Sequence, residues 1–99
     1  MWATSKEGTI VTQFFKMVQK PNGDVGYDQR VPVTNLCNRL DIGFRAGVIT
    51  ERPSHRDIAQ VLDGLGFTRE PRGLSYADLD YVGGEALRLL AQEHGLVPR

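Results

Sequence analysis

The sequence contains a single cysteine and no long run of apolar residues. Cys37 has no partner for an internal disulfide, and one thiol cannot build a thiolate-rich zinc site or an iron–sulfur cluster. The uninterrupted apolar runs are pairs and triples such as Phe14-Phe15, far below the roughly 18 to 20 residues that span a bilayer. The N-terminal residues also lack the pattern of a secretory signal. We therefore expect no membrane-spanning segment and a cytoplasmic location.

An excess of charge of one sign is also lacking. The chain has 12 Lys and Arg residues against 12 Asp and Glu residues, which gives a formal net charge of zero at pH 7. Nucleic-acid binders usually present a strongly positive face, because release of counterions from the phosphates supplies much of their affinity. Neutrality therefore argues against a general binder of the phosphate backbone, without excluding nucleic acid as a partner.

No group of residues has the spacing of a catalytic or metal-binding site. Cys37 lies within the apolar pattern of a predicted helix, where a free thiol is typically buried. His55 and His94 fall at helix ends, and neither has neighbours at a spacing that places several ligands on one helical face. We therefore expect a protein that is not an enzyme and that holds no cofactor and no metal ion.

The length of 99 residues is typical of one domain with one hydrophobic core. We expect residues 1–95 to form this domain. Residues 96–99 read Leu-Val-Pro-Arg, which resembles the remnant of a thrombin cleavage site left by a purification tag. We expect these residues to have no part in the function.

The first third of the sequence predicts a β-hairpin. Residues 9–19 are rich in β-branched and aromatic side chains and free of Gly and Pro, which favours a strand. Residues 20–24, Lys-Pro-Asn-Gly-Asp, are typical of a tight turn. Residues 25–33 then alternate between apolar and polar side chains, as a half-buried strand does. Pro32 lacks the N–H that a central strand needs and places this second strand at a sheet edge.

Three helices are predicted to follow, at residues 34–47, 54–65 and 76–94. Their candidate N-cap residues are Thr34, Ser54 and Ser75, and an aspartate follows the last two at the capping-box position. Apolar side chains recur at helical spacing behind each cap. The predicted fold is therefore α+β, with an N-terminal antiparallel β-hairpin followed by three α-helices packed as one small domain.

The preferred functional interpretation is a small non-catalytic protein-binding module. It would be a regulator, an inhibitor or an assembly subunit of the kind found in phages and mobile elements. Its partner would be another protein, bound through the hairpin edge and through arginine-bearing loops, or a second copy that forms a homodimer through the hairpin edge. The candidate partner-binding residues are Arg30, Arg69, Arg72, Phe15 and Met17.

The alternative is sequence-specific DNA binding by a helix-turn-helix at residues 34–65. The second helix of this motif would present side chains suited to base edges and phosphates near its N-terminus. Two features oppose this alternative: residues 48–53 are longer than the usual turn, and Asp57 and Asp63 add negative charge to the same helix. The candidate nucleic-acid-binding residues are Arg52, Ser54, His55, Arg56 and Gln60.

Overall fold

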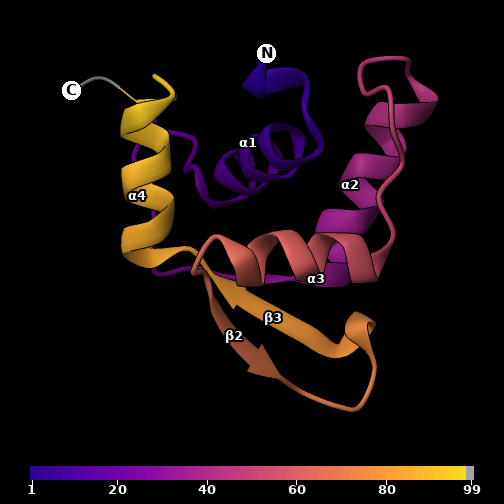
Figure 1. Cartoon of the computed structure of the whole chain (residues 1–99). Helices are drawn as coiled ribbons and strands as arrows, with labels where there is room; N and C mark the ends of the chain where they lie inside the picture. Colours follow the sequence, from indigo (N-terminus) through magenta and orange to yellow (C-terminus); the bar gives the residue numbers. More distant parts are fainter. Residues whose placement is uncertain (98–99) are drawn as a thin grey trace.

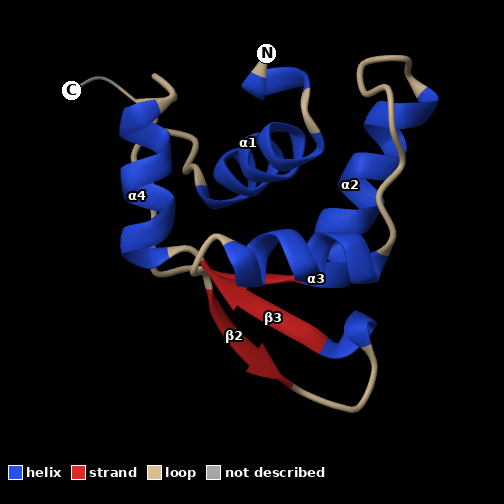
Figure 2. Ribbon diagram, viewed as in Figure 1, coloured by secondary structure: helices blue, strands red, loops and turns tan. Residues whose placement is uncertain are grey.

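A computed structural model describes residues 1–97 of the chain. The elements in chain order are η1 (Trp2–Thr4), α1 (Lys6–Val18), β1 (Arg30–Pro32), α2 (Val33–Arg45), α3 (His55–Gly64), β2 (Thr68–Pro71), η2 (Tyr76–Asp78), β3 (Leu79–Val82) and α4 (Gly84–Glu93), as Figures 1 and 2 show. Within residues 1–97, none of the helices has the length and apolar character of a membrane-spanning segment. Of the expected tag remnant at residues 96–99, positions 98 and 99 lie outside the described residues.

The first long element is a helix, so the predicted N-terminal hairpin is wrong. α1 follows Ser5, whose Oγ accepts a hydrogen bond of 3.0 Å from the backbone N–H of Gly8. The apolar side chains behind this cap occupy one helical face, and burial of that face outweighs the preference of β-branched and aromatic residues for strands. The buried apolar residues of α1 are Ile10, Val11, Phe14, Phe15 and Val18.

The predicted turn at residues 20–24 does reverse the chain. The backbone N–H of Lys20 donates to the carbonyl oxygen of Asp24 at 2.7 Å. The residues on either side form an isolated β-bridge, Gln19 with Val25, and not a hairpin. The turn therefore joins α1 to a loop that leads to β1.

The second strand was predicted at residues 25–33, but the strand observed there, β1, is shorter. α2 begins directly after β1. Pro32 is the last residue of β1 and the N-cap of α2. Thr34, predicted as the N-cap, instead donates a hydrogen bond of 2.9 Å from its hydroxyl to the carbonyl oxygen of Ala77. Thr34 thereby ties the first turn of α2 to η2.

The predicted helix at residues 76–94 is divided into η2, β3 and α4. Residues 79–82 form a strand because they pair with strands on both sides, and such long-range pairing overrides a local helical pattern. Gly83 is the N-cap of α4 and Gly84 is its first residue, so the Gly83-Gly84 pair marks the start of a helix directly after β3 and not the interior of a long one. The fold is α+β, as predicted, but residues 1–97 form four α-helices and a three-stranded antiparallel sheet in place of a hairpin followed by three helices.

β3 is the central strand of the sheet, whose order is β1-β3-β2. Tyr81 lies opposite Val31 of β1 and opposite Arg69 of β2. Since Val31, Leu79 and Tyr81 are buried, the face of the sheet that carries them packs on the core. β2 and β3 run below α3 in the view of Figure 1.

The opposite face of the sheet carries two ion pairs. Arg30 Nε lies 2.9 Å from Glu70 Oε2, and Arg72 Nε lies 3.1 Å from Asp80 Oδ1. Because β1 and β2 flank β3, the pair between Arg30 and Glu70 spans the central strand. Asp80 is only 6% exposed although it lies on this outer face. Side chains therefore tie all three strands together in addition to the backbone ladder.

α3 is anchored both to the sheet and to α1. The hydroxyl of the fully buried Tyr81 donates to Asp63 Oδ1 at 2.6 Å, with the Ala59 carbonyl oxygen as a second acceptor at 3.3 Å. The rings of Phe14 in α1 and Phe67, just after α3, meet edge to face with centroids 5.1 Å apart. These contacts set the position of α3 relative to the strands.

We predict that Tyr81→Phe lowers the free energy of unfolding by about 1 kcal/mol at neutral pH, because it removes the hydroxyl hydrogen bonds and leaves the ring. Burial and then the bond to Asp63 raise the pKa of Tyr81 above its ordinary value. The hydroxyl contribution is therefore fully present below the unfolded pKa of about 10 and is lost as pH rises toward the folded pKa.

Urea unfolding of the wild type and of Tyr81→Phe measures this effect. The measurements are made at neutral pH and at a pH above about 10, the pKa of tyrosine in the unfolded chain. The stability difference between the wild type and Tyr81→Phe should shrink on the alkaline side. Equal stabilities at neutral pH, or a difference that does not depend on pH, would show that the hydroxyl does not anchor α3.

Candidate functional site

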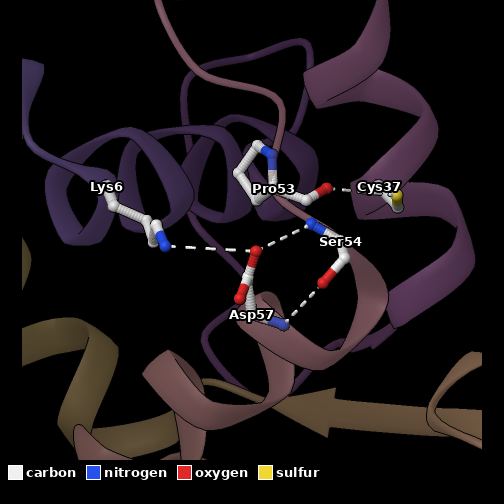
Figure 3. Close-up of polar contacts among 5 residues, drawn as sticks. All are labelled: Lys6, Cys37, Pro53, Ser54 and Asp57. Atoms are coloured by element: carbon white, nitrogen blue, oxygen red, sulfur yellow. Dashed lines mark hydrogen bonds and ion pairs between the residues drawn. The ribbon is translucent and has the colours of Figure 1, made fainter.

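α2 and α3 pack against each other although a long linker, residues 46–54, separates them. The linker first folds back over the end of α2, where a Cβ on Gly43 would lie only 2.5 Å from Ile49 Cδ1. It then returns to the middle of α2, where the Cys37 thiol donates to the Pro53 carbonyl oxygen at 3.7 Å, as Figure 3 shows. The linker is longer than a usual helix-turn-helix turn, but it loops out and returns to α2, so α3 still begins beside α2.

A capping box starts α3, as the sequence predicts. Ser54 Oγ accepts from the Asp57 N–H, and Asp57 Oδ2 accepts from the Ser54 N–H, each at 3.1 Å (Figure 3). The hydrogen bond from the Ser54 backbone lowers the pKa of the Asp57 carboxyl, and Lys6 of α1, 4.0 Å away, also lowers it. Asp57 therefore interacts with the helix cap and with α1.

The second carboxylate of α3 also has protein partners. Asp63 accepts the hydrogen bond from Tyr81 through Oδ1, and its Oδ2 lies 3.6 Å from Arg69 Nη1. Both acids that weigh against a role of α3 in binding anions are thus engaged with neighbouring groups.

The exposed side of α3 carries Arg56 and Gln60, one helical turn apart. The guanidinium carbon of Arg56 lies 5.2 Å from the centre of the Tyr76 ring, within the range of a cation–π contact. This contact joins the N-terminal part of α3 to η2.

The other predicted nucleic-acid-binding residues have different surroundings. Arg52 forms an ion pair with Asp41 of α2, with a distance of 2.8 Å between Nε and Oδ1. His55 is half-buried, and its Nε2 atom makes no hydrogen bond to the residues that the structure describes. Ser54 is exposed, but its Oγ serves the helix cap. The structure therefore separates Arg56 and Gln60 from the rest of the predicted set.

The β2–β3 hairpin runs back along α3 (Figure 1). Arg69 meets Asp63 near the C-terminal end of α3, and Tyr76 meets Arg56 near its N-terminal end. The tip of the hairpin, residues 72–75, therefore lies at the N-terminal end of α3. We call the combined region the α3–hairpin surface and define it by Arg56, Gln60, Arg69, Leu74 and Tyr76.

The predicted partner-binding residues do not form one surface. Phe15 is buried in the core, and Met17 is partly buried against it. Arg30 pairs with Glu70 on the outer face of the sheet. Arg72 pairs with Asp80 on that same outer face, whereas Arg69 meets Asp63 of α3. The α3–hairpin surface therefore contains Arg69 from this set together with Arg56 and Gln60 from the other.

Sequence reasoning missed Leu74 and Tyr76. Leu74 is a fully exposed leucine between Gly73 and Ser75, and an apolar residue at such a loop position was the available signal. Tyr76 was assigned to the predicted helix at residues 76–94. Because that helix does not form, the position of Tyr76 next to the hairpin tip could not be predicted.

The described residues show no assembly of reactive groups around this surface. Burial is the main cause that raises the pKa of the Cys37 thiol, which keeps it protonated at neutral pH. Within residues 1–97, no three His, Cys, Asp or Glu side chains come together in a way that could hold a metal ion. The groups that the α3–hairpin surface does offer are guanidinium, amide, aromatic and aliphatic.

No family model, curated protein or solved structure matches this chain.

We predict that Ser54→Ala lowers the free energy of unfolding by about 1 kcal/mol, because it removes the acceptor for the Asp57 N–H. Urea unfolding measures the loss. Ser75→Ala is the matched control, because Ser75 makes no side-chain cap to a helix and bonds only to the exposed carboxylate of Asp78. Equal losses in the two variants would contradict the assigned role of the capping box.

The carboxylate of Asp57 should make this region sensitive to acid. Its pKa is lowered in the folded state, so its stabilising contribution is present above the unfolded pKa of about 4 and is lost as pH falls through the folded pKa. The stability difference between the wild type and Asp57→Asn is therefore expected to be larger at neutral pH than at about pH 3. If the stability difference between the wild type and Asp57→Asn stays constant over this pH range, the charged Asp57 carboxylate is not the source of the stabilisation.

Proposed function

We propose that the chain binds double-stranded DNA, with α3 in the major groove and the β2–β3 hairpin beside it. The observation that carries this proposal is the division of polar groups on α3. Its two carboxylates interact within the protein, whereas Arg56 and Gln60 are exposed one turn apart. Arginine pairs with the O6 and N7 atoms of guanine and glutamine with the N6 and N7 atoms of adenine.

The order of the elements supports the same proposal. α2 and α3 form a helix-turn-helix pair, β1 precedes α2, and a β-hairpin follows α3 and completes the sheet with β1. This order is that of the winged form of the helix-turn-helix, in which the hairpin is the wing. Topology alone leaves the function open, so the exposed side chains of α3 carry the argument.

Neutral composition is compatible with this role because Arg69 has a weakly held partner and Arg72 has further N–H groups. The side chains of Arg69 and Arg72 are about half exposed, at 50% and 55%. Exposed ion pairs contribute at most about 1 kcal/mol, so phosphate oxygens are able to compete with Asp63 for Arg69. Arg72 keeps its Nε contact with the nearly buried Asp80, and its other N–H groups are able to donate to phosphate. We expect few phosphate contacts and a moderate dependence of affinity on salt.

Protein binding through a hairpin edge has less support from the fold. The hairpin predicted for residues 9–33 does not form, and Phe15, one of its proposed contact residues, lies in the core. The predicted homodimer through that edge loses its basis for the same reason. Binding of a protein partner through another surface stays a prediction.

Selection from a pool of random duplexes, followed by fluorescence anisotropy, tests the proposal. We expect binding at about 50 mM salt, and a slope of log affinity against log salt of about −2 to −3 if two or three phosphates are contacted. The absence of any bound duplex at this low salt concentration would overturn the proposal, because electrostatic attraction is strongest there.

We predict that Arg56→Ala weakens binding to the selected duplex by about 5- to 150-fold, the equivalent of roughly 1 to 3 kcal/mol for a bidentate base contact. It should also relax the preference at one base pair, while circular dichroism and thermal unfolding change little. Arg88→Ala is the matched control, because Arg88 pairs with Glu85 on α4, outside the α3–hairpin surface.

Both variants remove one positive charge, so their comparison separates base reading from general electrostatics. If Arg88→Ala weakens binding as much as Arg56→Ala does, and neither changes the sequence preference, α3 does not read bases through Arg56.

A further inference from the structure

Leu74 is fully exposed although the loop that carries it is closely braced. The Arg72 N–H donates to the Asp78 carbonyl oxygen at 2.7 Å, and the Asp78 N–H donates to the Ser75 carbonyl oxygen at 3.0 Å. The Ser75 hydroxyl adds a 3.0 Å hydrogen bond to Asp78 Oδ2. The fold therefore holds an aliphatic side chain outward on an ordered turn.

The turn passes close to Asp78, so a side chain at position 73 would crowd the Asp78 carboxylate. A Cβ on Gly73 would lie 2.6 Å from Asp78 Oδ2. The ion pair between Arg72 and the nearly buried Asp80 fastens the start of the turn to β3. These contacts limit the freedom of Leu74 to fold back onto the protein.

The surroundings of Leu74 combine aromatic and cationic groups. A surface hollow of about 180 Å³ lies beside it, lined by Arg69, Gly73, Leu74, Ser75, Tyr76 and Leu79. Arg56 of α3 lies over the Tyr76 ring, which is itself partly exposed. Apolar surface at the tip is thus continuous with the side chains proposed to contact DNA.

We propose that Leu74 is a wedge that enters a base step in the minor groove next to the major-groove segment occupied by α3. This inference rests on the proposed function. Apolar side chains that insert between base pairs unstack them and bend the duplex, and the bend brings more backbone into contact with the protein. Arg69 and Arg72, next to the tip, would contact the phosphates on the two sides of the opened step.

Position and charge favour DNA over a protein as the partner of the tip. The tip lies at the N-terminal end of α3, where Tyr76 contacts Arg56, so a duplex along α3 passes next to it. Arg69 lines the hollow beside the leucine, and Arg56 lies over the ring of Tyr76, which lines it too. These exposed guanidinium groups match the phosphates that border a minor groove.

The test compares Leu74→Ala with Leu89→Ala. Leu89 is also an exposed leucine, but it lies on α4, outside the α3–hairpin surface. The probe is a selected duplex of about 20 base pairs, a length that covers one helix-turn-helix site and its flanks. Anisotropy measures affinity, energy transfer between dyes at the duplex ends measures bending, and 2-aminopurine placed along the duplex reports unstacking through its fluorescence.

We expect Leu74→Ala to bind on the order of fivefold more weakly, because less apolar surface is buried in the complex. It should also lose the bend and the rise in 2-aminopurine fluorescence. Leu89→Ala should behave as the wild type. Leu74→Met should retain both optical signals, since methionine is a comparable apolar wedge.

The outcomes distinguish this inference from the proposed function. If the wild type binds the duplex and Leu74→Ala has the same affinity, bend and 2-aminopurine fluorescence, the wedge is overturned and DNA binding by α3 stands. A wild-type protein that binds no duplex would overturn both. If Leu74→Ala instead abolishes self-association measured by sedimentation without DNA, the tip binds a second copy and the wedge is wrong.

Discussion

Tyr81 provides the contact on which the arrangement of α3 and the hairpin depends. It lies in the central strand, opposite β1 on one side and β2 on the other, and its hydroxyl reaches Asp63 and Ala59 of α3. A buried hydroxyl needs such partners, since an unpaired polar group in the core is costly. The same bond that satisfies the tyrosine therefore aligns the hairpin with the helix and occupies one of the two acids of α3.

Charge pairing explains how a chain with zero net charge leaves Arg56 exposed on α3 while both carboxylates of that helix are engaged. The carboxylates of Asp57 and Asp63 serve a helix cap and a buried tyrosine, and Glu70 and Asp80 lie against arginines on the outer face of the sheet. Local surface chemistry is thus set by which charges are engaged and not by their sum. For the proposed binding of DNA, such pairing would limit nonspecific attraction to phosphate and leave more of the affinity to contacts that depend on base sequence.

Local signals allowed the sequence to predict α3, the approximate extent of α2 and the turn at residues 20–24. The capping box of Ser54 and Asp57 requires only neighbouring residues. α1 was missed because its β-branched and aromatic residues favour strands locally, and β3 because its pairing partners are distant in the chain. The candidate residues Arg56, Gln60 and Arg69 were identified from the sequence, but their place on one surface follows from tertiary contacts such as that between Arg69 and Asp63.

The position of β3 in the chain has a consequence for biosynthesis. β1, α2 and α3 are synthesised before β3, so the first strand stays unpaired while more than a third of the chain is added. Pairing of such distant segments is slow because a long loop must close first. A nascent chain that has not yet reached Tyr81 thus holds both helices without the strand that orients them. Competence for binding is expected to arise late, in one cooperative step, when the central strand inserts.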